Sequence, residues 1–355
     1  MRQLPKALMK WYQKHARILP WRGSSDPYEI WISEVMLQQT RIETVIPYFE
    51  KWMSIFQDLE SVSNSNEEEI LRIWEGLGYY SRARNIYKTA KIIMEDYNGE
   101  FPVDEAALRR LPGIGEYISG AIMSIAYHEK VPALDGNGIR VIARLFNYQQ
   151  PVNVNRNRNF LKKKLVELLP EKKPGDFNQA LMDLGSVICI PSDPKCTHCP
   201  LHKYCESFKK ATQNFLPVKG KKKRIPHYQV VAAIIENKIQ EVLIDKRPSK
   251  GFLGGLWEFP GGKVEKKESN EEALVRELKE ELGILVRPFE IFGIYKHTYT
   301  HFRVTVHTFF AKLDKGQPKP LQVEECEWVR VKELKHYQMG KVDRSISNDL
   351  QQRYQ

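Results

Sequence analysis

The spacing of apolar residues changes once along the chain, near residue 228. Before that point apolar residues recur at every third or fourth position, which is the spacing of one buried helix face. Segments with this spacing are residues 1–20, 26–40, 48–56, 67–74, 118–126 and 139–188. From Tyr228 onward short apolar runs typical of strands follow instead, at 230–235, 242–244, 304–311 and 328–331. The pattern predicts a multidomain protein in which an all-α domain precedes an α+β domain.

A basic, proline-flanked segment separates the two patterns. Residues 209–227 contain Lys219-Gly220-Lys221-Lys222-Lys223-Arg224 between Pro217 and Pro226. Such a run resembles a nuclear-import signal, but a solvated connector near a polyanion is the better interpretation. We therefore expect domains at residues 1–208 and 228–355, joined by a linker at 209–227.

Composition narrows the class of protein. The 355 residues carry a net charge of +11, which suits a polyanionic partner but is weak evidence alone. The N-terminus has no apolar core of signal-peptide length, and the longest clean apolar run, residues 230–235, is too short to span a bilayer. We expect a soluble cytoplasmic protein without a membrane partner.

Residues 111–137 combine a glycine turn with an acidic residue. Gly113 and Gly115 in Leu-Pro-Gly-Ile-Gly lack the Cβ atoms that would hold an approaching phosphate away, and a helix follows. Asp135, in Leu-Asp-Gly-Asn-Gly, precedes the next helical pattern. Such a turn is more often an ordinary helix connection, but the acidic element behind it favours a DNA-binding hairpin beside a carboxylate.

Glu34 lies within the apolar helix predicted for residues 26–40, where Asp26 and Pro27 are typical of a helix start. Its neighbours Ile30, Val35 and Leu37 would favour the protonated acid, as a general acid at neutral pH requires. Periodicity alone favours an ion-paired helix residue instead.

Four of the five cysteines lie close together. Cys189, Cys196, Cys199 and Cys205 are separated by six, two and five residues, which favours a metal centre over disulfides. A structural zinc site is the generic alternative. Cys326 stands apart and is expected to be a small core residue.

These motifs together resemble the helix-hairpin-helix DNA glycosylases, specifically the MutY-type adenine DNA glycosylases. The string Ser-Glu-Val-Met-Leu-Gln-Gln-Thr-Arg at 33–41 is similar to the family signature that carries the catalytic glutamate, here Glu34. The resemblance implies that Asp135 stabilises the anomeric carbon and that Tyr117 and Asn137 position both groups. Tyr117 stands where strand-nicking relatives carry a lysine, and a phenol forms no Schiff base, so the resemblance is to the monofunctional branch. Gly138 departs from the bulkier residue expected after Asn137.

The same resemblance assigns further residues. It places the hairpin near 108–126 and a 4Fe–4S cluster on Cys189, Cys196, Cys199 and Cys205, because their spacing is that of endonuclease III relatives. It implies DNA contacts by Gln39 and Thr40, by the wedge residues Leu77 and Tyr79, and by Gly113 and Gly115. Without the resemblance Gln39 would be a solvated helix-end residue, and Leu77 and Tyr79 would cover the core. Arg82 and Arg84 would contact phosphate or solvate a helix.

The C-terminal domain matches the Nudix box. Gly262, Glu268 and Arg276-Glu277-Leu278-Lys279-Glu280-Glu281-Leu282-Gly283 stand at its defining positions, and Glu277, Glu280 and Glu281 share one helix face, as a Mg²⁺ site requires. In MutY-type enzymes a Nudix-like domain reads 8-oxoguanine, with the box usually degraded. Tyr299-Thr300-His301 stands where that family usually has Phe-Ser-His.

The expected function is removal of adenine mispaired with 8-oxoguanine or guanine in double-stranded DNA, by a monomer acting in base excision repair. Glu34 would protonate adenine and later help to activate water, while Asp135 would face an oxocarbenium-like centre. Two rivals remain open. One is Mg²⁺-dependent hydrolysis of nucleoside diphosphates by the Nudix box, alone or as a second activity. The other is a lesion-binding protein without catalysis, against which the acidic pair Glu34 and Asp135 argues.

Overall fold

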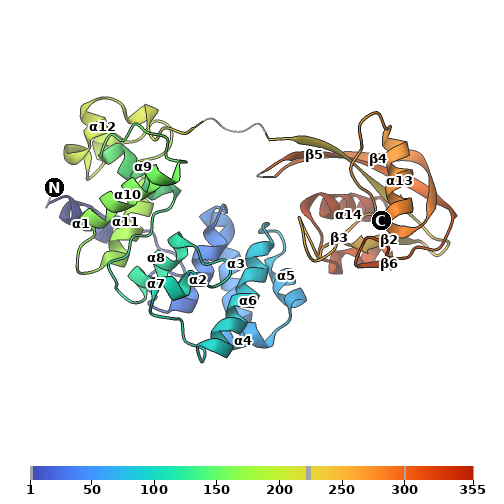
Figure 1. The fold of residues 1–355 in the computed structure, drawn as a ribbon, viewed down its shortest axis with the longest axis horizontal. Coiled ribbons are helices and arrows are strands. Elements are labelled where there is room, and N and C mark those ends of the chain that lie inside the picture. The colour runs from blue at the N-terminus through green and yellow to red at the C-terminus, as the bar shows by residue number, and fades with distance from the viewer. Residues whose placement is uncertain (1–2, 221–224, 300, 355) are drawn as a thin grey trace. The chain divides into compact units, whose positions relative to one another are not determined.

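The computed structural model describes residues 3–220, 225–299 and 301–354. The chain divides into two compact units, residues 1–77 with 81–222 and residues 78–80 with 223–355. The first unit is helical and the second contains the strands (Figure 1). No helix among the described residues is long and apolar enough to cross a membrane.

The helices of the first unit follow the predicted apolar spacing. They are α1 (Leu4–His15), α2 (Pro27–Leu37), α3 (Ile42–Ile55), α4 (Leu59–Asn64), α5 (Glu67–Trp74), α6 (Ser81–Asp96), α7 (Glu105–Leu108), α8 (Glu116–Ile125), α9 (Gly136–Leu145), α10 (Asn155–Leu168), α11 (Pro174–Val187) and α12 (Glu206–Lys209), with short 3₁₀ turns at Cys196–His198, His202–Tyr204 and Gln213–Phe215. The helix predicted over residues 1–20 ends at His15, and the irregular segment 16–26 follows it.

Helix α2 lies at the centre of this unit and packs against α3, α6 and α8. Asp26 caps its first turn by accepting a hydrogen bond from the Tyr28 amide at 2.8 Å, and Pro27 fits the first helical position. Its last carbonyls are capped by the buried guanidinium of Arg82, which donates to Val35 O at 2.7 Å and Met36 O at 2.9 Å. Arg82 is therefore a structural cap within the fold, neither a phosphate contact nor a solvated helix residue.

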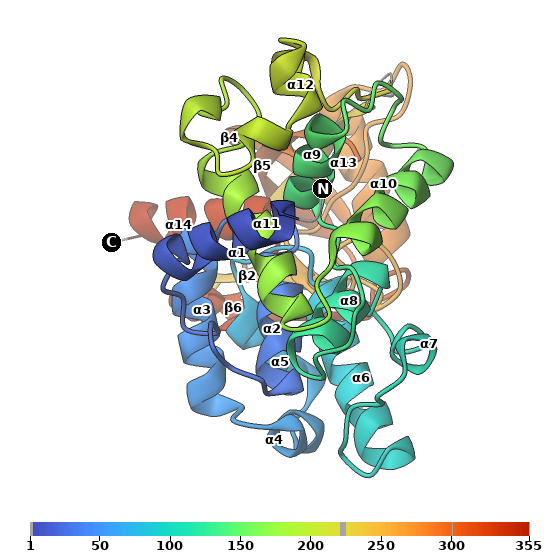
Figure 2. The same ribbon diagram turned by 90° about the vertical axis from the view of Figure 1, so that its left-hand side faces the viewer.

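Helices α8, α9 and α11 surround the segment that carries Asp135. A Cβ at Gly120 of α8 would lie 2.4 Å from Pro132 O, and one at Gly185 of α11 would lie 2.7 Å from the Asn137 Cβ. Glycine at these positions lets the chain approach both helices closely. Helices α1 and α11 lie side by side and share one apolar core with α9 and α10 (Figure 2).

The second unit is α+β. Its elements are β1 (His227–Ile235), β2 (Glu241–Lys246), β3 (Trp257–Glu258), α13 (Asn270–Leu282), β4 (Leu285–Thr298), β5 (Arg303–Lys315), β6 (Glu325–Arg330), a 3₁₀ segment at Val331–His336 and α14 (Lys341–Arg353). In one sheet β5 lies between β1, which is parallel to it, and the antiparallel β4. In the other β2 pairs with β3 and β6. Separate apolar clusters support α13 and α14.

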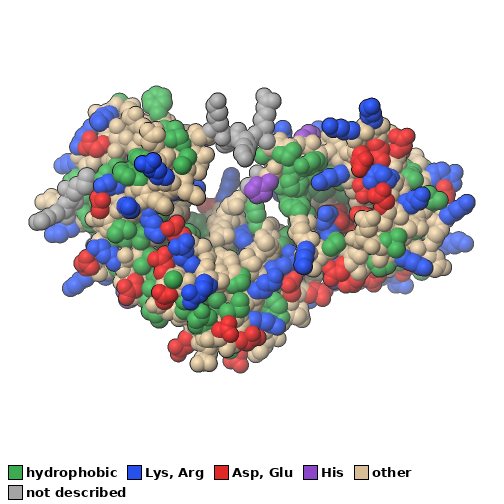
Figure 3. Space-filling view, viewed as in Figure 1, with side chains coloured by type: hydrophobic (Ala, Val, Ile, Leu, Met, Phe, Trp, Pro, Cys, Tyr) green, Lys and Arg blue, Asp and Glu red, His purple; other side chains and the backbone are tan. Residues whose placement is uncertain are grey.

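The first part of the predicted linker is packed against the helical unit. Leu216 is buried, its carbonyl accepts from Arg144 Nε at 2.9 Å, and Val218 O accepts from the Val152 amide at 3.0 Å. The basic residues of the run 221–224 lie outside the described residues. On the face shown in Figure 3, basic side chains of each unit are interspersed with acidic ones, so charge alone does not locate a site.

Candidate active site

A cavity of about 650 Å³ in the helical unit brings the predicted acidic residues together. It is walled by residues of α2, α8, α10 and α11, and by the segments 16–26, 38–42 and 134–139. Its lining includes Arg17, Trp21, Arg22, Glu34, Gln39, Thr40, Tyr117, Asp135, Asn137, Arg158, Gln179 and Met182.

Glu34 is held in this wall by a short hydrogen bond. Its side chain is buried on α2, and its Oε2 accepts from the Tyr117 hydroxyl at 2.5 Å. Burial raises the pKa of Glu34 to about 7, although the Tyr117 hydrogen bond and the Arg22 charge act against the rise. Burial and the neighbouring Glu34 charge raise the pKa of Tyr117, so the phenol remains a donor. Glu34 is thus able to exist as an acid at neutral pH, which a proton donor requires.

Asp135 stands in a different environment, at the N-terminus of α9. Its Oδ1 accepts from the Gly138 amide at 2.7 Å and its Oδ2 accepts from Asn137 Nδ2 at 2.9 Å. Two N–H donors and the positive end of the helix dipole stabilise a carboxylate charge at this position. A Cβ at Gly138 would lie 3.1 Å from Leu134 Cδ1 and 3.3 Å from Asp135 Oδ1, so glycine here leaves room for the cap.

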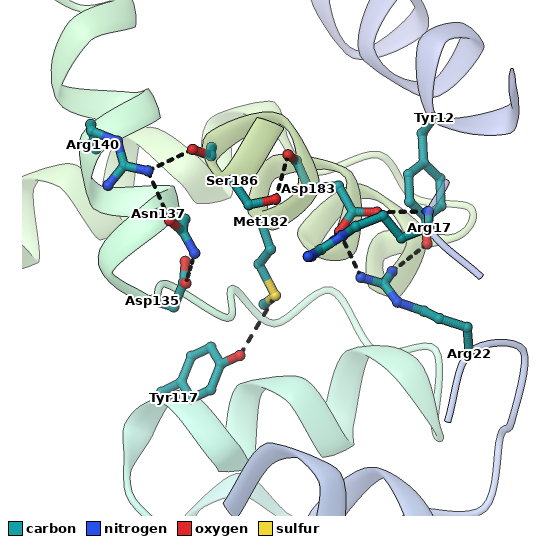
Figure 4. Close-up of polar contacts among 11 residues, drawn as sticks. Tyr12, Arg17, Arg22, Tyr117, Asp135, Asn137, Arg140, Met182, Asp183 and Ser186 are labelled. Carbon is teal, nitrogen blue, oxygen red and sulfur yellow. Dashed lines mark hydrogen bonds and ion pairs between the residues drawn. The ribbon is translucent and has the colours of Figure 1, made fainter. Parts of the chain in front are cut away.

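Arg140 connects Asn137 to the cysteine segment. It donates to Asn137 Oδ1 at 2.8 Å, to Gly185 O at 2.6 Å and to Cys189 O at 2.7 Å. Figure 4 shows the resulting chain of contacts from Asp135 through Asn137 to Arg140, and also Tyr117, whose hydroxyl lies 3.5 Å from Met182 Sδ. The orientation of Asn137 is therefore fixed from α11 and the cysteine segment.

The four clustered cysteines line one small cavity, together with Arg144, His202 and Phe208. Nitrogen donors reach two of the sulfurs, since Arg144 Nη1 lies 3.4 Å from Cys189 Sγ and the Leu201 amide lies 3.4 Å from Cys199 Sγ. Donors of this kind stabilise thiolate sulfurs and tune iron–sulfur centres. Within the described ranges no three His, Cys, Asp or Glu side chains are arranged to hold a single metal ion. The four cysteines thus lie at one place in the fold, as a site held by four thiolates requires.

The two glycines of the hairpin between α7 and α8 differ in whether the fold itself requires glycine at that position. Gly113 has φ +79°, and a Cβ there would lie 2.8 Å from the Asn85 Cβ, so the fold itself requires this glycine. Gly115 caps α8, and a Cβ there would meet nothing within 4 Å. Of these two glycines, Gly115 is the one that borders open space.

The remaining predicted DNA contacts lie at turns. Gln39 follows α2 with φ +59°, beside Thr40, and both line the cavity. Leu77 is buried, and Tyr79 has φ +50° in the turn between α5 and α6. In the second unit the Tyr299 amide donates to Phe302 O at 2.8 Å, which closes a turn bearing the exposed His301. Thr300 lies outside the described residues.

Several cavity residues were not predicted from the sequence. Arg22 belongs to Leu-Pro-Trp-Arg, a string that otherwise indicates only a helix end. Gln179 and Met182 lie one turn apart on α11, directly before the cysteine segment. Their spacing on one helix face was the available signal, but it is shared by any packed helix.

Comparisons with known proteins agree with this arrangement. Residues 32–165 match the family described as HhH-GPD superfamily base excision DNA repair protein, and residues 230–349 match the NUDIX domain. A solved structure of a thermostable thymine-DNA glycosylase is 31% identical, with a TM-score of 0.55, and the match covers 59% of this chain and 96% of that one. Fold and site thus define a helix-hairpin-helix DNA glycosylase with a Nudix domain, which confirms the predicted fold class.

Relatives matched over both domains or over most of the chain narrow the class. The adenine DNA glycosylase of Buchnera aphidicola subsp. Baizongia pistaciae is 39% identical over 259 residues, which cover 72% of each chain. That of Arabidopsis thaliana is 34% identical over 383 residues, covering 90% of this chain and 60% of the plant protein. The chain belongs to the adenine DNA glycosylase family, as the resemblance predicted.

The raised pKa of Glu34 predicts that this residue lowers the stability of the protein at alkaline pH while it supports activity. The folded value of about 7 lies above the ordinary value of 4.5, so the folded state binds the proton more tightly. The parent therefore loses free energy of unfolding as the pH rises from about 4.5 to about 7. Glu34→Gln has no such loss, and at pH 8 we expect it to be more stable than the parent by roughly 1–3 kcal/mol, with no base release.

Urea unfolding at pH 5 and pH 8 checks this expectation. The gain in free energy of unfolding on changing Glu34→Gln should be small at pH 5 and largest at pH 8. Glu29→Gln, a change on the same helix outside the cavity, serves as the control. A stability difference independent of pH would contradict the assignment of a perturbed acid.

Proposed function

We propose that the chain removes adenine paired with 8-oxoguanine or guanine in double-stranded DNA by hydrolysing the N-glycosidic bond, without cutting the strand. The observation that carries this proposal is the cavity that is lined both by the protonatable Glu34, held by Tyr117, and by Asp135. Glycoside hydrolysis needs one carboxyl as acid and one carboxylate facing an oxocarbenium-like centre. The base is identified as adenine by the family relationship.

In the proposed mechanism, Glu34 donates its proton to a ring nitrogen of adenine, which turns the base into a neutral leaving group. Positive charge then develops on the sugar, where the carboxylate of Asp135 stabilises it. Asn137 and the Gly138 amide keep that carboxylate in place. Glu34, now ionised, accepts a proton from the attacking water. Tyr117 directs the Glu34 carboxyl through its hydrogen bond and supplies no amine for a covalent intermediate.

The DNA contacts belong to the same proposal. The target nucleotide leaves the duplex and enters the cavity, and Gln39 and Thr40 occupy the space near the opposite base. Gly113 and Gly115 receive a phosphate, and Leu77 and Tyr79 separate the bases. Tyr299, Thr300 and His301 of the second unit recognise 8-oxoguanine.

Cys189, Cys196, Cys199 and Cys205 are proposed to hold a 4Fe–4S cluster. When bound, the cluster would cross-link the segment 189–205 through four iron–sulfur bonds, and a hydrolysis that transfers no electrons needs no redox step from it. Arg144 supports this segment by donating to Ile190 O at 2.7 Å and Pro191 O at 2.9 Å.

Base release without strand cleavage is tested by single-turnover reaction with an end-labelled duplex containing adenine opposite 8-oxoguanine. Strand breaks are expected only after hot alkali, because Tyr117 cannot form a Schiff base. Breaks without alkali would show that an amine elsewhere acts as nucleophile. An absence of breaks after alkali, from protein loaded with iron and sulfide, would contradict glycosylase action on this mispair.

A second candidate function is Mg²⁺-dependent hydrolysis at the Nudix box, favoured by one observation. Glu281 Oε2 is buried without a hydrogen-bond partner, and burial raises the pKa of Glu281 to about 7. The box is otherwise occupied by its own ion pairs, since Arg276 contacts Glu268 at 2.7 Å, Glu277 at 3.0 Å and Glu280 at 3.4 Å. Among the residues described, the carboxylates Glu277, Glu280 and Glu281 do not converge on one ion. The side chains as arranged do not fit a bound Mg²⁺, and the box has a structural explanation in clasping α13 to the preceding loop.

Hydrolysis of nucleoside diphosphate derivatives in the presence of Mg²⁺ is therefore expected to be absent. Phosphate release is measured with parent protein and with Glu280→Gln, each at equal concentration. Mg²⁺-dependent turnover by the parent that disappears in Glu280→Gln would contradict this expectation and establish a second activity.

A further inference from the structure

Asp183, which lies behind the cavity wall, binds two arginines. Its side chain is fully buried on α11 and accepts from Arg17 Nε at 2.9 Å and Nη2 at 2.5 Å, and from Arg22 Nη2 at 2.9 Å. The Arg17 amide also lies within 3.3 Å. Both guanidinium groups point at this one carboxylate in Figure 4, although 161 residues separate Asp183 from Arg22.

The two arginines belong to the cavity, but Asp183 lies behind it. Arg17 and Arg22 line the wall beside Glu34, whereas α11 contributes Gln179 and Met182 to that wall. Arg22 is held from a second side, because its Nη1 donates to the Tyr12 hydroxyl at 2.5 Å. Both arginines come from the irregular segment 16–26, where the Arg22 amide donates to Leu19 O at 2.9 Å but no continuous helix fixes the direction of the two side chains. Their positions therefore depend on side-chain contacts with α1 and α11.

We propose that Asp183 is a positioning residue for base release, which holds Arg17 and Arg22 against the cavity and offsets their charge where Glu34 must keep its proton. A buried ion pair contributes little net stability on average, so stability alone is a weak explanation for a carboxylate shared by two arginines. Because the two arginines lie beside the proton donor Glu34, the shared carboxylate has a chemical explanation. This inference rests on the proposed function of Glu34 as the acid.

One hydrogen-bond donor and two charged groups act on Glu34. Tyr117 of α8 donates a hydrogen bond, Asp135 at the start of α9 is negative, and Arg22 is positive. Arg17 and, from α10, Arg158 line the same cavity. Removing the Asp183 charge makes this surrounding more positive while Tyr12 still holds Arg22. A more positive surrounding favours the ionised carboxylate, so the pKa of Glu34 falls.

The test is the pH dependence of single-turnover adenine release by full-length protein, from pH 5 to pH 9, on duplex with adenine opposite 8-oxoguanine. The parent rate should decline through an alkaline limb as Glu34 loses its proton. In Asp183→Asn this limb should move to lower pH by roughly 0.5–1 unit. Affinity for the same duplex, measured with both proteins, should change less than threefold.

Three further variants make the outcome specific. Asp183→Glu keeps the charge and should restore the limb to the parent position. Ser186→Ala, one turn along α11, removes a hydroxyl that donates to the Asp183 carbonyl at 2.9 Å and should leave the limb unchanged. If Asp183→Asn does not fold, Arg17→Gln in a protein that keeps Asp183 removes a cation from the cavity wall, and the limb should then move to higher pH.

An unchanged limb in folded Asp183→Asn would overturn the proposal, as would an equal shift in Ser186→Ala. An upward shift of the limb in Asp183→Asn would overturn the proposal too, because it would mean that Asp183 does not offset the arginine charge. Failure of the parent to release adenine from this duplex would instead contradict the proposed function, so the two failures are distinguishable.

Discussion

The site depends on one buried hydrogen bond, from the Tyr117 hydroxyl to Glu34 Oε2 at 2.5 Å. A carboxyl on an apolar helix face is expensive to ionise, and burial accordingly raises the pKa of Glu34 to about 7. The phenol limits this rise and fixes the direction of the carboxyl. Without Tyr117, Glu34 would be a buried acid of undefined orientation. With it, the acid is both protonatable near neutral pH and aimed into a cavity.

The second acidic residue is arranged by opposite means. Asp135 sits at a helix start, where the Gly138 amide and Asn137 Nδ2 donate to it. One carboxyl is thus surrounded by apolar side chains and the other by N–H donors. Acid-assisted cleavage of a glycosidic bond requires one carboxyl that can donate a proton and one carboxylate beside the sugar. Close helix packing at Gly185 and the contacts of Arg140 keep the second group in position.

Much of this arrangement was predictable from the sequence, for different reasons. The helices of the first unit follow from apolar spacing, and the pairing of Glu34 with Asp135 follows from resemblance to a family. Periodicity alone would have assigned Glu34 to an ion pair. Arg82 shows the limit of local patterns, because its role as a buried cap of α2 depends on carbonyls more than forty residues away. The anchoring of Arg22 by Asp183 was likewise invisible, since it exists only after α1 and α11 pack together.

In the second unit, β4 escaped prediction for a geometric reason. Its pairing with β5 shifts register at several points, so apolar and polar residues do not alternate regularly along it. The Nudix box was evident from its sequence motif, but the motif did not indicate that Arg276 contacts Glu268, Glu277 and Glu280 at once. Motifs therefore identified the fold of this unit more securely than its chemistry.

The central claim is that Glu34 holds a proton near neutral pH while bonded to Tyr117. The most direct test is a ¹³C NMR titration of protein labelled at the glutamate side-chain carboxyl, with the Glu34 signal assigned by its absence in Glu34→Gln. The account predicts a midpoint near 7 that rises further in Tyr117→Phe, because the hydrogen bond that lowers the pKa of Glu34 is then missing. A midpoint near the ordinary value of 4.5, unchanged in Tyr117→Phe, would contradict it.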